Sequence, residues 1–317
     1  MSTIAIDIKD KINNLEKDIE NLKFISESNE IDLSDKINDL EIKLKELKKE
    51  IKRELSPYDK VILSRDIKRP TTKDYIDIIC SEFIELHGDR LYGDDPSIIC
   101  GIGKIGEFKV TIVGHQKGND VKENIKRNFG MPHPEGYRKA LRIMKQAEKF
   151  NRPIITFIDT PGAFCGLEAE KRGQGEAIAK NLLEMSKLKV PIICFVIGEG
   201  GSGGALGIGV GNEICMLEHS VYSVISPEGL SSILFKDASK SREASEVMKL
   251  TSKDLYDLNI IDKVINEPTN GAQEDITSVA KDIKYIVIDR LNYYKKLSSK
   301  EIVENRYNKF RNIGRCL

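Results

Sequence analysis

The stretch VIGEGGSGGALGIG, residues 196–209, decides the fold of this chain. It follows an apolar run, residues 191–196 (PIICFV), which predicts a fully buried strand. Glycines then occupy positions 198, 200, 201, 203 and 204, before Ala205 and Leu206 begin a predicted helix. Each glycine weakens a helix or strand by about 0.5–1 kcal/mol relative to alanine, so secondary structure alone does not explain them. The pattern predicts backbone N–H groups that face an anion, or an oxygen that becomes one, at a helix N-terminus.

This glycine stretch differs from the common nucleotide-binding loops. No Gly-Lys-Ser/Thr ends it, which excludes a Walker A phosphate loop. Residues 198–203 (GEGGSG) fit G-x-G-x-x-G, but the match lies late in the chain and is weak evidence for a dinucleotide fold. A tight strand-to-helix crossing, in which the glycines serve close packing only, stays open as the alternative.

A second glycine turn lies one strand–helix unit earlier in the sequence. Residues 153–158 (PIITFI) predict another buried strand, residues 159–163 (DTPGA) follow it, and residues 174–188 predict a helix. The carboxyl ends of parallel strands meet at the same edge of a sheet, where ligands of open α/β folds bind. Taken alone, DTPGA is an ordinary turn with proline and glycine at its centre. Taken together with the glycines at 198–204, DTPGA predicts one binding site built from both stretches.

The amino-acid composition argues against several classes of function for this protein. Lys plus Arg and Asp plus Glu balance at 50 each among 317 residues, which argues against a dedicated nucleic-acid site. No run reaches the ~18 apolar residues of a membrane span, and the first residues lack the apolar region of a signal peptide. The six cysteines form no C-x-x-C pair, so no bound metal and no disulfide framework is predicted. We expect a cytoplasmic protein without a membrane partner.

The chain divides into three predicted segments. Residues 1–55 carry apolar residues at spacings of three and four, which predicts a coiled-coil-like helical hairpin: Ile8, Ile12, Leu15, Ile19, Leu22, then Leu33, Ile37, Leu40, Leu44, Leu47 and Ile51. Residues 56–270 predict the core, and residues 271–317 a C-terminal helical segment.

Within the core, strands and helices alternate. We expect a helix over 73–86, a strand hairpin over 98–114, an irregular basic stretch over 119–133 and a helix from Pro134. The end of the chain predicts one long helix over 275–297 followed by a charged tail. Repeated parallel strand–helix units predict an α/β fold.

Six motifs occur in an order that resembles one known family. They are GHQKG (114–118), RNFGMPHPEGYRKALRIM (127–144), PIITFIDTPGA (153–163), KRGQGEAIA (171–179), VIGEGGSGGALGIGVG (196–211) and YSVISPEG (222–229). The chain resembles the α subunit of the carboxyltransferase component of bacterial acetyl-CoA carboxylase over nearly its whole length. The resemblance implies a crotonase-like (ClpP/crotonase) fold of repeated ββα units. Phe164-Cys165 departs from the aromatic-proline pair common in the family, which puts the local loop shape in doubt.

The resemblance also implies a reaction and its partners. Carboxybiotin, supplied in trans on the biotin carboxyl carrier protein, gives its carboxyl group to acetyl-CoA, and the product malonyl-CoA enters fatty acid synthesis. The implied assembly is an α₂β₂ heterotetramer with a zinc-ribbon β subunit, alongside the ATP-binding biotin carboxylase. On this basis the amides of Gly203 and Gly204 form the oxyanion hole for the ureido oxygen of biotin. A Cβ at either position is expected to abolish transfer and leave the fold intact.

Further substrate-binding residues are predicted around these two amides. Four shape the pocket: Gly200, Gly201, Gly162 and Ala163. His115 is the best placed of the four histidines, because it ends a strand before a glycine turn. Lys117, Lys126 and Arg127 belong to a basic cluster, with Lys122, Arg138 and Arg142, that is predicted to bind CoA phosphates or the carrier. For Arg138 and Arg142 a solvated helix face is an equal alternative.

Two other functions compete with this interpretation. The first is a carboxyltransferase subunit for another acyl-CoA, such as propionyl-CoA, with the same fold and glycine turns. The second is a non-catalytic crotonase-fold scaffold that only binds a partner, against which the two intact glycine turns argue. An exchange assay with the β partner separates them.

Overall fold

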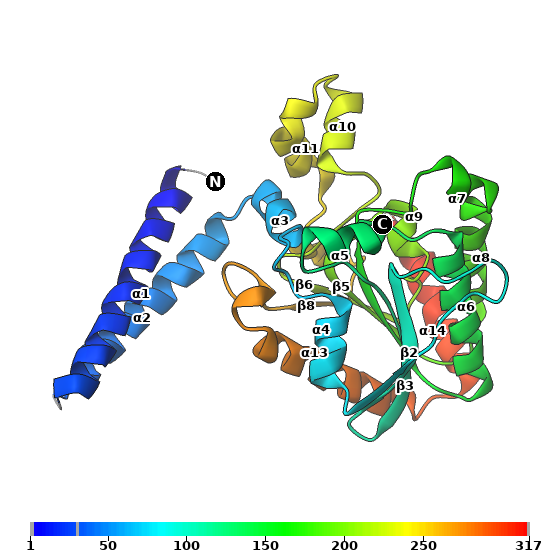
Figure 1. Ribbon diagram of the computed structural model, residues 1–317, viewed down its shortest axis with the longest axis horizontal. Helices are drawn as coiled ribbons and strands as arrows, with labels where there is room; N and C mark the ends of the chain where they lie inside the picture. Colours follow the sequence, from blue (N-terminus) through cyan, green and yellow to red (C-terminus); the bar gives the residue numbers. More distant parts are fainter. Residues whose placement is uncertain (1–2, 30–31, 316–317) are drawn as a thin grey trace. The chain divides into compact units, whose positions relative to one another are not determined.

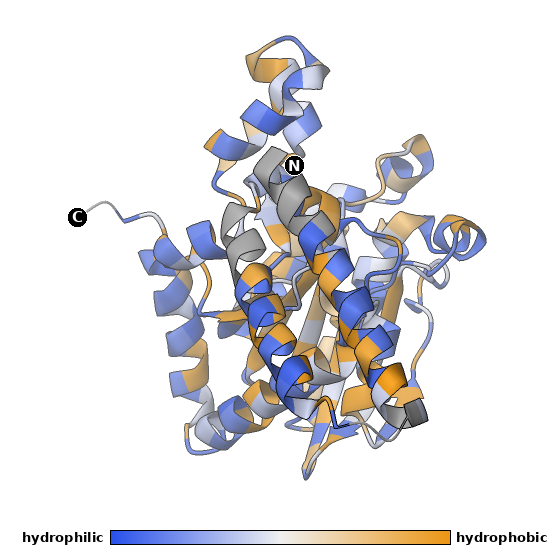
Figure 2. Ribbon diagram, turned by 90° about the vertical axis from the view of Figure 1, so that its left-hand side faces the viewer, coloured by the Kyte–Doolittle hydropathy of each residue, from blue (hydrophilic) through white to orange (hydrophobic). Residues whose placement is uncertain are grey.

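The computed structural model describes residues 3–29 and 32–315 and forms two compact units, residues 1–59 and 60–317. In the first unit, α1 (Thr3–Asn29) and α2 (Ser34–Glu54) run antiparallel. Ile12 is buried against Leu44 and Leu47, and Lys23 forms an ion pair with Glu41 at 2.7 Å. In Figure 2, hydrophobic and hydrophilic residues alternate along the coloured parts of both helices. The predicted helical hairpin is therefore present.

The second unit contains one mixed sheet, with the strand order β1-β2-β3-β4-β5-β6-β8 and β7 paired to the far end of β5. The first three strands are antiparallel and the rest are parallel. The strands are β1 (Glu82–Glu85), β2 (Ile98–Ile105), β3 (Phe108–His115), β4 (Ile154–Thr160), β5 (Ile192–Gly201), β6 (Glu213–Leu217), β7 (Val221–Ser223) and β8 (Lys263–Ile265). The predicted α/β fold is confirmed.

Helices cover both faces of this sheet (Figure 1). Along β5, alternate side chains enter opposite cores: Ile193 and Phe195 lie in one, Cys194 and Val196 in the other. The first core is closed by α4 (Thr72–Ile79) and α13 (Ile276–Tyr294), the second by α6 (Pro134–Lys149), α8 (Gln174–Lys187) and α14 (Ser299–Asn312). Double coverage explains why the central strands are continuous apolar runs. No described helix is long and apolar enough to cross a membrane.

Three predicted elements differ from the structure. The helix expected over 73–86 ends at Ile79, and residues 82–85 form the edge strand β1, because Gly101 of β2 leaves the space that the Phe83 ring occupies. The stretch 119–133 is not wholly irregular, since Asp120 caps the short helix α5 (Val121–Lys126). The helix predicted over 275–297 is present as α13, but the charged tail after it forms a further helix, because Ser298 and Glu301 form a capping box that starts α14.

A buried arginine joins α14 to the sheet. The Arg306 side chain is fully buried and donates hydrogen bonds to the carbonyl oxygens of Met185, Leu188 and Val190 at 2.7–2.8 Å. It also bonds Oδ1 of Asn212. Burial lowers the pKa of Arg306 to about 10, so it stays protonated at neutral pH. Residues 271–315 are thus part of the second unit rather than a separate layer; Cys316 lies outside the described residues.

We predict that Arg306→Met lowers the free energy of unfolding by about 3 kcal/mol or more, because several buried acceptors lose their donor at about 1–3 kcal/mol each. Urea unfolding measures the change. Arg311→Met, on the same helix at an exposed position, is the control and should stay within about 0.5 kcal/mol of the parent. Equal effects of the two changes would show that Arg306 does not anchor the helix.

Candidate functional site

The two glycine turns lie in direct contact at the carboxyl edge of the sheet. A Cβ on Gly204 would lie 2.5 Å from the backbone N of Ala163 and 2.5 Å from the carbonyl carbon of Gly162. A Cβ on Gly201 would overlap the carbonyl group of Pro161. The structure therefore brings together Gly162, Ala163, Gly201 and Gly204, as the sequence predicts. Close packing, the alternative explanation, accounts for Gly201 and Gly204.

Gly203 is different, because no contact among the described residues requires a glycine there. Its nearest neighbour to an added Cβ would be Cγ2 of Ile178 at 3.9 Å, and its backbone is not left-handed. Gly203 lies in the first turn of α9 (Ser202–Leu206), where glycine is about 1 kcal/mol less favourable than alanine. Packing within the described residues therefore does not explain this glycine.

The helix after the turn differs from the predicted one. It begins at Ser202 rather than Ala205 and is only five residues long, so the amides of Gly203 and Gly204 belong to its first turn. Ser202 itself has φ of 48°, a left-handed conformation that is rare outside glycine. At this bend strand β5, which ends at Gly201, passes directly into α9.

An ion network that the sequence analysis missed holds both turns. Nζ of Lys117, at the end of β3, lies 2.8 Å from Oδ1 of Asp159 and 2.9 Å from Oε2 of Glu199. The backbone N–H of Glu199 donates to Oδ1 of Asp159 at 2.9 Å. Asp159 and Glu199 end β4 and β5 just before the glycine turns, so one ammonium group fixes three strand ends.

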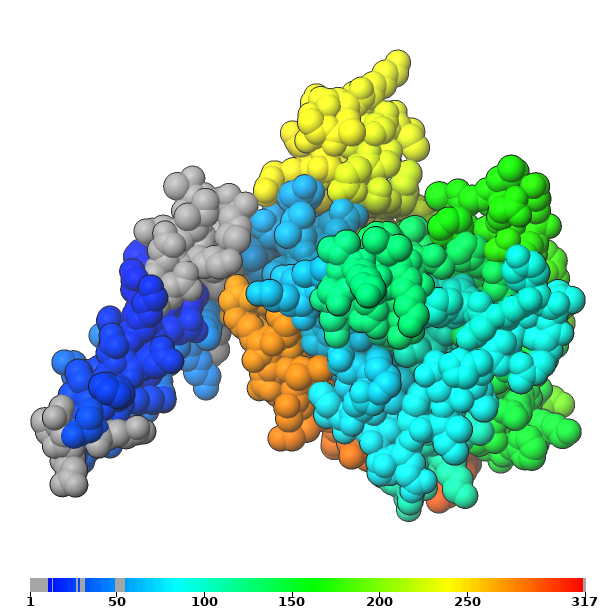
Figure 3. All heavy atoms as spheres, in the orientation of Figure 1, coloured from blue at the N-terminus to red at the C-terminus, as the bar shows by residue number. Residues whose placement is uncertain are grey.

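Arg65 extends this network to a lobe of the protein. Its Nε donates to Oε1 of Glu199 at 2.7 Å and its Nη1 to Oε1 of Glu228 at 2.8 Å. Glu228 begins the lobe of α10 (Pro227–Leu234) and α11 (Ser241–Met248), which stands out in yellow in Figure 3. Burial raises the pKa of Glu199, but Lys117 and Arg65 outweigh it and hold that pKa below its usual value.

These positions change the predicted roles of the basic residues. Lys117 is occupied by two carboxylates and is not free for a phosphate. Arg127 donates to the carbonyl oxygen of Pro96 and pairs with Glu123, whereas Lys126 is exposed on α5. Arg138 and Arg142, expected with Lys122 in the same cluster, bind Asp89 and the carbonyl oxygens of Gly88 and His87. Four members of the predicted basic cluster therefore make separate structural contacts, namely Lys117, Arg127, Arg138 and Arg142, while Lys122 and Lys126 are exposed.

His115 does not meet solvent. Its side chain is fully buried beside the backbones of Phe157 and Gly204. Burial lowers the pKa of His115 to about 3, so the ring is neutral at physiological pH. The prediction that His115 contacts substrate is corrected to a role in the core beneath the turns.

Side chains on α6 and α8 brace the glycine turn from behind. The Tyr137 hydroxyl donates to the carbonyl oxygen of Gly204 at 3.3 Å. Nδ2 of Asn181 donates to the carbonyl oxygens of Tyr137 and Gly207 at 3.0 and 2.9 Å. These hydrogen bonds hold the carbonyl groups of Gly204 and Gly207 in place.

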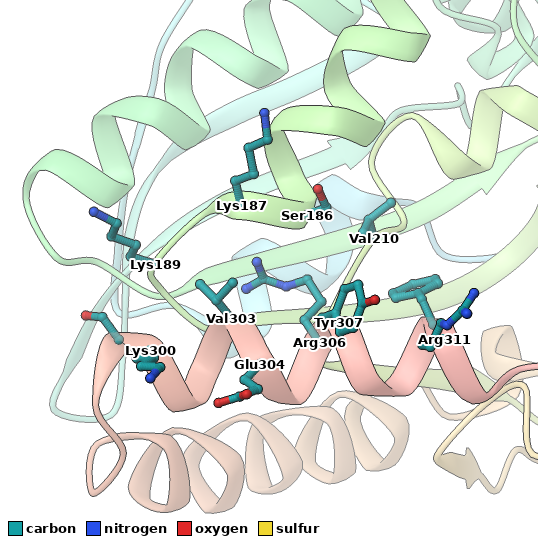
Figure 4. A pocket seen from close by; sticks show the side chains of 12 residues that line it. Ser186, Lys187, Lys189, Val210, Lys300, Val303, Glu304, Arg306, Tyr307 and Arg311 are labelled. Atoms are coloured by element: carbon teal, nitrogen blue, oxygen red, sulfur yellow. The ribbon is translucent and has the colours of Figure 1, made fainter.

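The cavities do not single out these amides. Gly200, Gly201 and Ser202 line a cavity of about 50 Å³, too small for a cofactor ring. A cavity of about 1020 Å³ lies elsewhere, between α8 and α14, where Val303, Arg306 and Tyr307 point toward it and Glu304 points away (Figure 4). In the described part of the chain, no cluster of three or more His, Cys, Asp or Glu could hold a metal ion.

We predict opposite effects on stability for alanine at two adjacent glycines. Gly204→Ala should lower the free energy of unfolding by about 2 kcal/mol, because its Cβ meets backbone that cannot move aside. Gly203→Ala should leave that energy unchanged or raise it by up to about 1 kcal/mol. Urea unfolding of both variants tests this, and a loss at Gly203 as large as at Gly204 would contradict it. The expectation of an intact fold after substitution is thereby kept for Gly203 and withdrawn for Gly204.

A second prediction concerns the stability of the protein at low pH. An unfolded histidine has a pKa near 6.5, whereas His115 in the fold stays unprotonated down to about 3. Because the unfolded chain binds the extra proton, stability should fall as pH drops from about 6.5, by up to about 1.4 kcal/mol per pH unit from this group. His115→Leu should flatten the measured dependence between pH 6.5 and 4.5, and an unchanged slope would count against it.

Comparisons with known proteins agree with this geometry. A family model described as "Acetyl co-enzyme A carboxylase carboxyltransferase-like" matches residues 5–314. The acetyl-coenzyme A carboxylase carboxyl transferase subunit alpha of Alkaliphilus oremlandii is 56% identical over 303 residues, 96% of either chain. The subunit of that name from Clostridium acetobutylicum is 56% identical over 268 residues, 84% of this chain and 98% of its own.

Solved structures show the same fold. A Pseudomonas malonate decarboxylase hetero-tetramer in complex with coenzyme A matches with a TM-score of 0.58 at 13% identity, over 76% of this chain and 92% of that one. Transcarboxylase 12S matches at 0.55 with 20% identity, over 70% of this chain and 44% of that one. The fold is the crotonase-like α/β fold of these enzymes. The chain belongs to the family of acetyl-coenzyme A carboxylase carboxyltransferase alpha subunits.

Proposed function

We propose that this chain forms the biotin side of a two-subunit carboxyltransferase that makes malonyl-CoA from acetyl-CoA. The observation that carries the proposal is Gly203, a glycine in the first turn of α9 where an added Cβ would meet no described atom closer than 3.9 Å, so packing does not explain it. Family membership supplies the reaction class. The partner β subunit would hold acetyl-CoA and complete the site.

The residues of the turn fit the needs of such a site. When bound, carboxybiotin supplies an activated carboxyl group, and the departure of that group leaves negative charge on the ureido oxygen. The amides of Gly203 and Gly204 are placed to stabilise that charge as preorganised donors at the first turn of α9. Lys117, Asp159 and Glu199 keep the donors fixed, so little reorganisation is needed during the reaction. Gly162 and Ala163 form the adjoining wall and Gly200 and Gly201 its base.

The partners belong to the same proposal. We infer an α₂β₂ heterotetramer with a zinc-ribbon β subunit, served by the biotin carboxyl carrier protein and biotin carboxylase in the cytoplasm. Metal would then belong to the β subunit and not to this chain. A subunit for another acyl-CoA would keep the same biotin side, so a comparison of acetyl-CoA with propionyl-CoA as acceptor decides between them.

The test is carboxyl exchange between malonyl-CoA and biocytin, catalysed by the chain together with its β partner. The intact pair should be active. Gly203→Ala keeps the N–H group, but its Cβ should push the ureido oxygen off the amide and lower kcat by about 100-fold or more, as the loss of one oxyanion donor does. Gly93→Ala is the matched control, since its Cβ meets nothing within 4 Å and its backbone, like that of Gly203, is not left-handed. Normal exchange by a folded Gly203→Ala complex would refute the assignment of the amides.

A further inference from the structure

Three consecutive residues beside the glycine turns have left-handed backbones. Asn128, Phe129 and Gly130 have φ of 49°, 55° and 73°. Only glycine adopts this region without cost, so Asn128 and above all Phe129 are strained. Strained residues cluster at functional sites, where the surrounding structure holds them.

Hydrogen bonds and a close contact hold the loop of residues 128–130 in this conformation. The backbone N–H groups of Gly130 and Met131 donate to the carbonyl oxygens of Arg127 and Asn128 at 2.9 Å. Nδ2 of Asn128 lies 3.1 Å from Nδ1 of His133. An added Cβ on Gly130 would lie 2.8 Å from Cγ of Lys117, so the loop presses directly on the ion network.

The same loop is tied to the first glycine turn. The backbone N–H of Phe164 donates to the carbonyl oxygen of Pro132 at 3.0 Å, and Nε2 of Gln174 donates to that oxygen at 2.7 Å. The His133 ring stacks on the Phe164 ring with centroids 4.2 Å apart. The loop and the turn therefore form one rigid body, in which the position of Phe129 is set relative to Gly162.

The Phe129 side chain itself is not used by the fold in this way. It is 48% exposed and lines a cavity of about 420 Å³ together with Pro161 and Ile67. A strained backbone that presents an aromatic ring to solvent gains nothing for stability, since burial of the ring would be favourable. The arrangement therefore points to a ring contact with a ligand.

The charges around this cavity indicate what the ligand is. Lys117 is paired with Asp159 and Glu199, Arg65 with Glu199, and Arg69 with Glu267. Cations already matched by carboxylates attract a phosphate less strongly, which argues against the nucleotide end of coenzyme A in this cavity. The exposed apolar part of the lining consists of Phe129, Pro161 and Ile67. It suits the uncharged face of a ring system.

We propose that Phe129 is a substrate-contacting residue on which the bicyclic ring of biotin packs while its ureido oxygen meets the amides of α9. This inference rests on the proposed function and adds the residue that positions the ring. Aromatic contacts contribute modestly beyond burial, so the loss of one corresponds to about a three- to tenfold change in an equilibrium constant. The cost falls on biotin binding rather than on the acetyl-CoA side.

The experiment measures exchange kinetics of the chain with its β partner, using biocytin and malonyl-CoA. Phe129→Ala should raise KM for biocytin about three- to tenfold and leave KM for malonyl-CoA and kcat within twofold. Phe150→Ala is the matched control, because Phe150 is also exposed, at 59%, but ends α6 away from the turns. Phe129→Trp, which keeps an aromatic ring, should restore a KM near that of the parent.

Phe129→Gly separates the ring contact from a structural role. Glycine adopts the left-handed backbone freely, so this variant should unfold at a urea concentration equal to or above that of the parent. Its KM for biocytin should nevertheless rise as in Phe129→Ala. An unchanged KM in both variants, or a rise for malonyl-CoA instead, overturns this inference alone. A parent complex that exchanges no carboxyl groups overturns the proposed function and this inference with it.

Discussion

Backbone touches backbone where the second glycine turn meets the first, and the rest of the site depends on that contact. Gly201 lies against the carbonyl group of Pro161, and Gly204 lies against Gly162 and Ala163, with no room for a Cβ at either glycine. The contact fixes the ends of β4 and β5 relative to each other more closely than side chains would allow. It also places the first turn of α9 at the carboxyl edge of the sheet, where parallel α/β folds bind ligands.

A network of ion pairs also holds these strand ends in position. Lys117 links the ends of β3, β4 and β5 through Asp159 and Glu199, and Arg65 continues the chain of ion pairs to α10. Buried charges are costly to desolvate, but here each is met by an opposite charge and a hydrogen bond. Such a network specifies one arrangement of the strand ends rather than adding much stability. Rigid donors are what stabilisation of a developing oxyanion requires.

The sequence predicted correctly the strands and helix starts that depend only on neighbouring residues. The runs PIITFI and PIICFV became buried strands, and Pro134 and Gln174 begin helices as expected. The edge strand β1 was missed because its pairing depends on space above Gly101, and α14 because its anchor, Arg306, binds residues far away in sequence. At the site, sequence identified the glycines but misassigned Lys117 and His115, since spacing does not tell whether a polar residue is paired or buried. The strain at Phe129 has no sequence signal except the neighbouring Gly130.

The aromatic-cysteine pair after the first turn gives this chain a chemical handle. Phe164 holds the loop through its stack on His133, while the next residue, Cys165, is exposed. Burial raises the pKa values of the thiols of Cys80, Cys100, Cys194 and Cys215, and buried thiols react slowly with alkylating reagents. A maleimide dye would thus attach at Cys165 in preference to these four. A fluorophore there would lie at the rim of the site and report the arrival of a partner by its emission.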